Sequence, residues 1–253
     1  MGRTHPSIST AGRAGTRARL AGMEITAVRA ELLDVNCYAV AAEPGAEAGP
    51  GDDTADRECV IVDAGFDCAP DLARVLAELG WTPVAVLLTH GHPDHILGLP
   101  RLLEAFPGLE VLIGEPDLYR LQDPASTVSA QLAHIVAPLV GEWTAPEAAA
   151  VSGTEPFTRA GLTIAPDPAP GHTEGSTLWR VSDPHGEGDA AEVLFTGDVL
   201  FAGSIGRTDL VGGDGQAMER TLAHIASLPD TPVLPGHGPA TRLAHELRTN
   251  PFL

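Results

Sequence analysis

One short segment constrains the fold more than any other feature, because four metal-type ligands fall within six of its residues. The segment reads Thr89-His90-Gly91-His92-Pro93-Asp94-His95. An apolar run at 84–88 precedes it and is typical of a buried strand, and residues 96–103 are typical of the start of a helix. We therefore expect the ligands on a loop at the carboxyl end of a strand, where a rigid strand aims the loop.

The spacing of these ligands suits two cations. Positions two apart in an extended loop project to the same side, so His90 and His92 can share one cation. Asp94 and His95 lie one turn further on, at a helix start that Pro93 favours, and can face a second cation. Imidazoles and a carboxylate without a thiolate favour zinc or another borderline divalent metal. The alternative is a His-rich surface turn with no ligand.

Three further motifs each follow an expected strand. They are Pro170-Gly171-His172-Thr173, Phe195-Thr196-Gly197-Asp198 and Pro235-Gly236-His237-Gly238-Pro239. A glycine precedes each ligand and lets the backbone turn closely around a cation. Each motif alone is an ordinary turn, but together they bring the count to five histidines and two aspartates at strand ends. Seven ligands suffice for two metals, with Asp198 free to bridge them.

The periodic segments predict two similar halves. Strand and helix alternate over 23–140 and again over 161–253, and such halves can pack sheet against sheet with helices outside. Strands are expected at 24–32, 37–43, 59–62, 84–88, 109–113, 162–165, 176–181, 192–196 and 232–234, and helices at 70–80, 116–140, 216–228 and 240–249. Irregular segments are expected at 44–57, 141–160 and 183–191, the second as a flap or a linker between the halves.

The first 22 residues differ from the rest of the chain. They contain Arg3, Arg13, Arg17 and Arg19, no acidic residue and no apolar stretch of a secretory signal. We expect a disordered N-terminal extension over 1–22, with a transit peptide as the alternative, and a single domain over 23–253.

Composition excludes several classes of function. The net charge of −19 disfavours nucleic acid as a partner. All fifteen basic residues are arginine, so a lysine Schiff base is excluded. Three cysteines without CxxC spacing indicate neither a disulfide framework nor a thiolate zinc site. No apolar run approaches about 18 residues, so no membrane span is expected. We expect a cytoplasmic protein, a monomer or small homo-oligomer.

Histidines outside the motifs receive ordinary roles. His134 lies on the apolar face of an expected helix and is interpreted as packed rather than ligating. His185 is expected to be exposed in the 183–191 hairpin. His224 and His245 lie in expected helices without ligand neighbours and are interpreted as structural or surface residues.

The ordered set of motifs resembles the metallo-β-lactamase superfamily, and the resemblance covers the chain after Met23. It implies an αββα sandwich, an α/β fold of four layers. It also implies that His90, His92 and His172 hold a first metal, that Asp94, His95 and His237 hold a second, and that Asp198 bridges them. Asp63, at the end of an early strand, would support the ligand loop by hydrogen bonds. The implied cofactors are two divalent ions, with zinc favoured and iron or manganese as alternatives.

The branch of the superfamily is indicated by other residues. True β-lactamases of the family often carry cysteine in place of Asp198, and the flavodiiron branch has glutamate in place of His92, so both branches are disfavoured. The stretch 204–210, with Arg207, is similar to glyoxalase II-type hydrolases (hydroxyacylglutathione hydrolases) and persulfide dioxygenases. The endings 235–239 and 250–253 favour short glyoxalase II-like hydrolases. Long glyoxalase II enzymes add a basic helical region that binds glutathione, and because this chain stops soon after His237, another thiol is possible as carrier.

The function implied is hydrolysis of a small-molecule acyl thioester by a metal-bound hydroxide. Asp94 is the catalytic candidate, because it can orient the hydroxide besides binding metal. Arg207 is a candidate contact for a substrate carboxylate, with structural pairing to Asp209 as the alternative. The alternative enzyme is a mono-iron persulfide dioxygenase using His90, His172 and Asp198. A non-enzymatic metal-dependent binding module is the remaining alternative.

Overall fold

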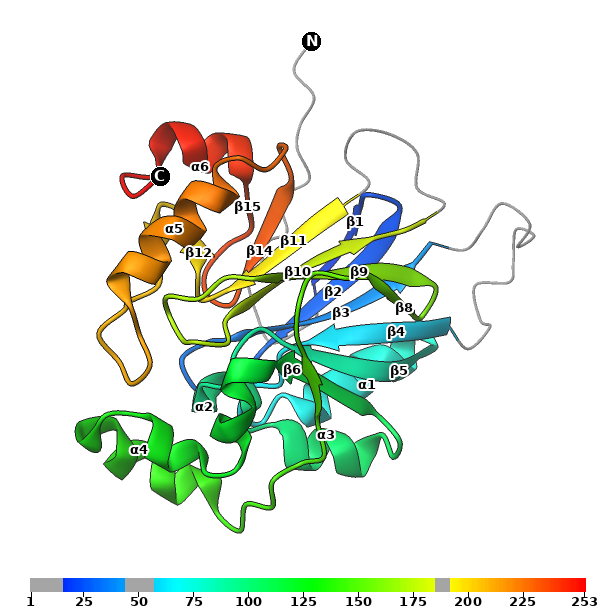
Figure 1. Cartoon of the computed structure of the whole chain (residues 1–253). Helices are drawn as coiled ribbons and strands as arrows, with labels where there is room; N and C mark the ends of the chain where they lie inside the picture. Colours follow the sequence, from blue (N-terminus) through cyan, green and yellow to red (C-terminus); the bar gives the residue numbers. More distant parts are fainter. Residues whose placement is uncertain (1–15, 44–56, 185–191) are drawn as a thin grey trace.

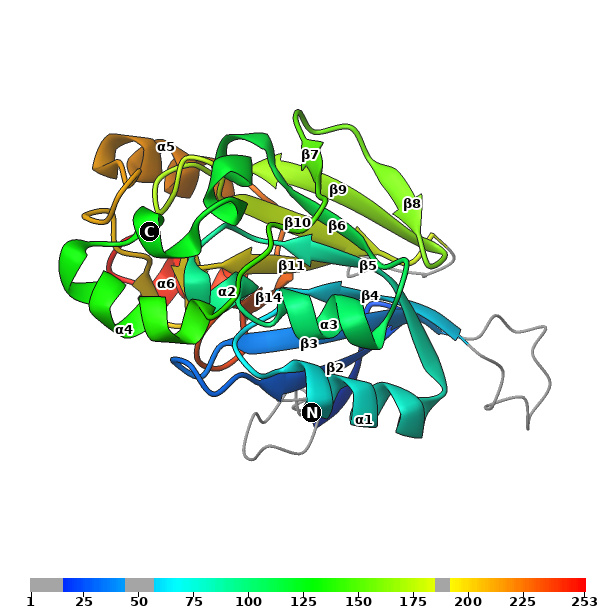
Figure 2. The ribbon, with the colours of Figure 1, turned by 90° about the horizontal axis from the view of Figure 1, so that it is seen from below.

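Two β-sheets face each other at the centre of the molecule, with helices on both outer sides (Figures 1 and 2). The computed structural model describes residues 16–43, 57–184 and 192–253. The expected four-layer αββα sandwich is confirmed. Residues 44–56 of the loop expected over 44–57 lie outside the described residues, and so do residues 185–191, with His185, of the hairpin expected over 183–191.

The first sheet has seven strands in the order β1-β2-β3-β4-β5-β6-β7. They are Thr16–Leu20, Met23–Arg29, Asn36–Ala42, Arg57–Val62, Trp81–Leu88, Glu110–Gly114 and Ala149–Val151. The strands from β4 to β7 are parallel neighbours, and the strands from β1 to β4 are antiparallel neighbours.

The second sheet has six strands in the order β15-β14-β11-β10-β9-β8. In that order they are Thr241–Arg242, Pro232–Pro235, Glu192–Gly197, Thr177–Ser182, Leu162–Pro168 and Phe157–Arg159. A two-stranded ribbon of β12 (Leu200–Phe201) and β13 (Ser204–Ile205) follows β11.

Each central strand of the first sheet contributes to two hydrophobic cores, because successive side chains of a strand point to opposite faces of the sheet. In β4, Val60 and Val62 belong to the core between the sheets, whereas Ile61 belongs to the core beneath the outer helices. In β5, Leu87 faces inward and Leu88 outward in the same way. The central strands are therefore apolar on both faces, as a sheet covered on both sides requires.

The helices cover the outer faces. Helices α1 (Ala69–Leu79) and α3 (Leu99–Ala105) pack on the seven-stranded sheet, and α5 (Gly215–Ile225) and α6 (Leu243–Thr249) pack on the six-stranded sheet (Figure 1). Asp214 begins α5 by accepting hydrogen bonds from the backbone N–H groups of the first helical turn, an N-cap that the sequence supplies. Among the helices described, none is long and apolar enough to cross a membrane.

The start of the ordered domain differs from the expected boundary at Met23. Residues Thr16–Leu20 form β1, which pairs with β2 through a tight turn at Ala21-Gly22. The expectation of a disordered extension is therefore wrong for residues 16–22. The physical reason is a buried carboxylate: Glu24 of β2 accepts hydrogen bonds from Arg17 and Arg19 of β1. Residues 1–15 lie outside the described residues.

The expected helix over 116–140 is also wrong in part. The segment forms two 3₁₀ helices, η1 (Glu115–Leu121) and η2 (Pro124–Thr127), followed by α4 (Ala130–Val140). Pro124 interrupts any continuous helix, because proline lacks the N–H that the helix needs. His134 is exposed on α4 rather than packed. The segment 141–160, which contributes β7 and β8, connects the two sheets.

Candidate metal centre

The predicted ligands lie on loops that leave the carboxyl ends of four strands. His90 and His92 follow β5, and the short helix α2 (Pro93–Ile96) that begins there carries Asp94 and His95. His172 follows β9, Asp198 follows β11 and His237 follows β14. The fold thus brings all seven side chains to one edge of the sandwich.

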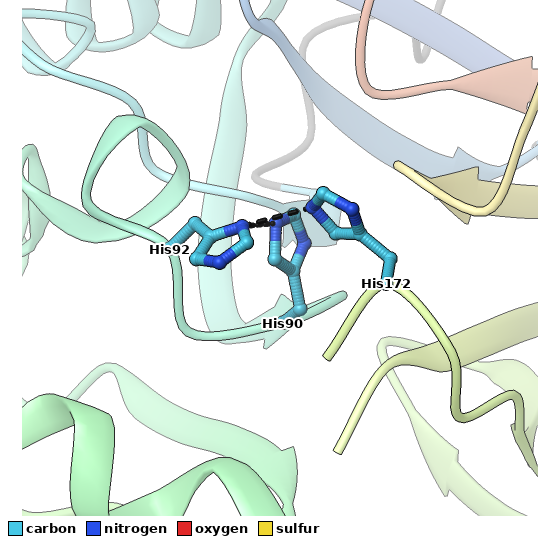
Figure 3. A group of neighbouring side chains, drawn as sticks. All are labelled: His90, His92 and His172. Carbon is cyan, nitrogen blue, oxygen red and sulfur yellow. Dashed lines mark hydrogen bonds between the residues drawn. The ribbon is translucent and has the colours of Figure 1, made fainter. Parts of the chain in front are cut away.

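Three histidines form a first group (Figure 3). The distance from His90 Nε2 to His92 Nδ1 is 3.1 Å, and that from His92 Nδ1 to His172 Nε2 is 2.8 Å. All three side chains are buried. Three ring nitrogen atoms that all lie within 4.8 Å of one another can bind one divalent cation.

A second group lies beside the first. His237 Nε2 lies 3.4 Å from Asp94 Oδ2, and His95 Nε2 lies 3.8 Å from the same oxygen. A Cβ atom at Gly236 would lie only 2.6 Å from Asp198 Oδ1 and from His95 Cε1. Only glycine therefore lets the strand-end backbone approach this closely.

The Asp198 carboxylate faces both groups. Its Oδ2 atom lies 3.6 Å from His172 Nε2 in the first group and 3.4 Å from His237 Nε2 in the second. Its Oδ1 atom lies 3.2 Å from His95 Nε2. A single carboxylate in this position could bind two cations at once.

Hydrogen bonds fix the orientation of four of the five histidines. The ring nitrogen turned away from the centre, Nδ1, meets an oxygen in each case. The pairs are His90 with Thr89 Oγ1 at 3.1 Å, His95 with Asp63 Oδ2 at 2.8 Å, His172 with the Arg207 carbonyl at 2.8 Å and His237 with the Leu33 carbonyl at 2.9 Å. An Nδ1–H that donates outward leaves the Nε2 lone pair free for a cation.

Asp63 lies beneath the ligand loop. Its carboxylate accepts hydrogen bonds from the Thr89 backbone N–H at 2.8 Å and from His95. Its backbone has a φ of 61°, a conformation that non-glycine residues adopt at a cost. Asp63 therefore fixes both the end of β5, through the Thr89 N–H, and the imidazole ring of His95.

Among the described residues, three buried polar atoms of the candidate ligands have no hydrogen-bond partner: His92 Nε2, His95 Nε2 and Asp198 Oδ1. The last two lie 3.2 Å apart without hydrogen-bond geometry. Leaving such atoms unpaired is costly. A cation between them would satisfy both atoms, so the residues present fit a metal site.

The two groups differ in their affinity for protons. Burial and the neighbouring histidines lower the pKa of His90, and burial lowers the pKa of His92 to about 3. Burial alone would also lower the pKa of His95 and His237, but nearby carboxylates outweigh it and raise the His237 pKa to about 10. Burial thus favours the neutral form of His90 and His92, whereas the carboxylates around His95 and His237 favour the protonated form of those two rings.

Arg207 is placed differently from the other candidates. Its guanidinium is exposed and forms two hydrogen bonds to Asp209, at 2.6 and 2.7 Å. This is the structural pairing that the sequence left open, and substrate contact stays a prediction. No sequence motif indicates the backbone role of Arg207, whose carbonyl accepts a hydrogen bond from His172 Nδ1 and orients that ring.

Two buried residues near the centre are not part of any sequence motif. Asp117 and Arg120 lie in η1, within a segment that the periodicity assigned to a long helix. Both side chains are fully buried, and they hydrogen-bond to each other and to the ligand loops. No local sequence motif marks these two residues, because the ligand loops that they contact are distant in the sequence and come close only in the folded chain.

Comparisons with known proteins agree with this geometry. A sequence profile of the Metallo-beta-lactamase superfamily matches residues 53–237. An uncharacterized protein of Mycobacterium tuberculosis is 36% identical over 233 residues, which cover 91% of this chain and 98% of that protein. The chain therefore belongs to the metallo-beta-lactamase superfamily.

Relatives with named activities are also similar. A probable metallo-hydrolase of Bacillus subtilis is 34% identical over 201 residues, 78% of this chain and 88% of that protein. A hydroxyacylglutathione hydrolase of Salmonella paratyphi C is 37% identical over 172 residues, 68% of this chain and 53% of that protein.

Two solved structures share the whole fold. The BLEG-1 B3 metallo-beta-lactamase has a TM-score of 0.73 and 30% identity, covering 90% of this chain and 99% of that one. TTHA1623, solved in a di-iron-bound form, has a TM-score of 0.67 and 32% identity with the same coverage.

Proposed function

We propose that the protein is a binuclear metal-dependent hydrolase that cleaves an acyl thioester. The observation that carries the proposal is the position of the Asp198 carboxylate between two groups of three donors, since its Oδ2 atom lies 3.6 Å from His172 Nε2 and 3.4 Å from His237 Nε2. A mononuclear site would need only one of these groups. The similarity to a hydroxyacylglutathione hydrolase supports the thioester as the substrate class.

The proposed chemistry divides between the cations and the chain. Divalent cations would supply hydroxide at neutral pH, since zinc lowers the pKa of water from about 15.7 to about 7, and would polarise the carbonyl. Asp94 contributes one oxygen to the second group and can orient the attacking water with the other. Asp63, through His95, keeps the donors in place while the substrate binds.

The leaving group decides how much further help is needed. A thiolate leaves readily without a strong general acid, whereas an amine or alkoxide requires protonation. A thioester therefore suits a centre in which four of the five histidines already use their outward nitrogen in a hydrogen bond and their inward nitrogen would face a cation. We propose zinc as the native metal, with iron and manganese as the alternatives. A small-molecule substrate and a cytoplasmic monomer or small homo-oligomer complete the proposal.

A substrate panel tests this function. Purified protein of known metal content is assayed with lactoylglutathione, other acyl thioesters, a β-lactam and a glutathione persulfide with oxygen-uptake recording. We expect thioester hydrolysis that a chelator abolishes and zinc restores. One iron per chain with oxygen uptake on persulfide would instead assign the dioxygenase that uses His90, His172 and Asp198. Hydrolysis of the β-lactam alone would assign the activity named for BLEG-1.

A further inference from the structure

Asp117 is buried between the two loops that carry the first group of histidines. Its Oδ2 atom accepts hydrogen bonds from the Gly91 backbone N–H at 2.7 Å and from Thr173 Oγ1 at 2.8 Å. Its Oδ1 atom accepts from the Gly175 backbone N–H at 2.8 Å and from Arg120 Nε at 3.1 Å. One carboxylate thus receives four hydrogen bonds and exposes no surface.

These partners lie next to the histidines of the first group. Gly91 stands between His90 and His92, and Thr173 directly follows His172. The two loops are 80 residues apart in sequence, yet their donors must meet within about 3 Å. Asp117 therefore links the two halves of the three-histidine group from behind.

Arg120 completes this link. Its side chain is fully buried and packs directly against Gly91, where a Cβ atom would lie 2.7 Å from the Arg120 Cβ. Its guanidinium donates to Asp117, to Glu174 and to the Val211 carbonyl. The buried pair of Asp117 and Arg120 thus connects the two ligand loops to each other and to the loop that contains Val211.

The second group has other supports. His95 is held by Asp63 and His237 by the Leu33 carbonyl, and Asp94 lies on α2. Among the residues that the structure describes, Asp117 accepts hydrogen bonds from the loops of the first group and from Arg120. A change at Asp117 should therefore act on one group and spare the other.

We propose that Asp117 is a positioning residue that sets the cation affinity of the His90/His92/His172 group independently of the second group. The inference rests on the proposed function in so far as both groups bind cations. Asparagine at this position keeps the shape but replaces one acceptor oxygen with an NH₂ group, which would face N–H or O–H donors. Loops that lose these bonds no longer hold three nitrogens at one point, and such changes typically cost 10–100-fold in metal affinity.

Variants with one group disabled resolve the two sites. Asp117→Asn is combined with His237→Ala, which leaves the first group, and with His172→Ala, which leaves the second. Metal-free proteins are titrated with Co²⁺, followed by visible absorption, and with Zn²⁺ in competition with a chromophoric chelator. We expect Asp117→Asn to lower affinity about 10–100-fold beside His237→Ala and by less than about threefold beside His172→Ala.

Two further variants keep the test independent of overall stability. Glu24→Gln alters a buried carboxylate that contacts no ligand loop, and it should leave both affinities unchanged. Thr173→Val removes one of the hydrogen bonds to Asp117, and it should weaken the first group in the same direction even if Asp117→Asn fails to fold.

Three results overturn the inference. They are an unchanged cation affinity of the first group in Asp117→Asn, an equal loss of affinity beside His237→Ala and beside His172→Ala, or an equal loss of affinity in the control Glu24→Gln. Its failure can be told from failure of the proposed function. Wild-type protein that binds two cations without cleaving thioesters removes the proposed substrate and leaves the inference standing. Wild-type protein that binds no cation overturns both.

Discussion

At the scale of single residues, the centre consists of candidate metal ligands and of a second set of residues that hold the ligand loops in place. The convergence of the seven candidate side chains could be predicted from the sequence, because glycine-flanked histidines and aspartates at strand ends form short local motifs. Asp117 and Arg120 could not be predicted, since their partners Gly91 and Thr173 lie far away in the chain. A local pattern reports a loop that carries ligands but not the side chains that hold two loops together.

Asp198→Asn tests the residue that faces both groups. The amide keeps the size of the side chain but removes the negative charge that would balance two cations. We expect the bound metal to fall from two ions per chain to one or fewer and thioesterase activity to fall at least about 100-fold, as loss of a ligand costs more than the 10–100-fold typical of an outer partner. Elemental analysis and turnover on the same samples measure both effects.

Asp230→Asn, which makes the same change at a carboxylate paired with Arg242 away from the centre, is the matched control. Full metal content and activity in Asp198→Asn would remove Asp198 from the assignment.

At the scale of elements, the long central strands were predicted well, whereas β1, the short strands such as β7 and β8, and the irregular segments were predicted poorly. The runs around Val60 and Leu87 are apolar and are bounded by turn residues, so both the type and the place of β4 and β5 follow from local pattern. In β1 the sequence TRARL has little apolar character, and its pairing depends on a carboxylate in the next strand. The 3₁₀ helices of 115–127 have helical composition, but the proline at 124 and the buried contacts of η1 prevent one continuous helix.

Glu24→Gln tests what holds β1 to the sheet. Glu24 is fully buried and forms ion pairs with Arg17, Arg19 and Arg57 at 2.5, 2.9 and 2.8 Å. Burial alone would raise the pKa of Glu24, but the three arginines outweigh it and hold the pKa below its usual 4.5. A carboxyl with a lowered folded-state pKa stabilises the fold above the unfolded-state value and loses this contribution as pH falls through the folded value.

The expected result is therefore pH-dependent. Glu24→Gln should lower the free energy of unfolding by about 2 kcal/mol at pH 7, as expected for a hydrogen-bonded charged group. The difference from wild type should shrink as the pH falls below 4.5 toward the lowered pKa of folded Glu24. Urea denaturation of metal-free proteins at several pH values measures it. A difference that stays constant or grows as the pH falls below 4.5 would show that the Glu24 carboxylate does not hold β1.

At the scale of the whole molecule, the centre joins parts that are otherwise separate. The ligands come from both sheets, since His90 to His95 follow a strand of the first sheet and His172, Asp198 and His237 follow strands of the second. Asn36 of the first sheet and Pro235 of the second are also joined at this edge, by a 3.0 Å hydrogen bond. A cation bound here would link the two halves of the sandwich.

Metal removal should therefore lower the stability of the whole fold. A ligand present at about 1,000 times its dissociation constant stabilises the native state by about 4 kcal/mol, and for a chain of this size each kcal/mol corresponds to about 2–4 °C. We expect a chelator to lower the midpoint of thermal unfolding by about 10 °C and added zinc to restore it. Differential scanning calorimetry measures the shift, and the doubly disabled variant His172→Ala/His237→Ala should show little of it. An equal shift in that variant would place the stabilising metal elsewhere.

Anomalous diffraction from crystals of the zinc-loaded protein tests the two-cation centre most directly. Data collected on both sides of the zinc absorption edge should show two peaks about 3.5–4 Å apart. One peak should lie among His90, His92 and His172, the other among Asp94, His95 and His237, with Asp198 between them. A single peak in fully loaded protein, or peaks away from these seven side chains, would contradict the account.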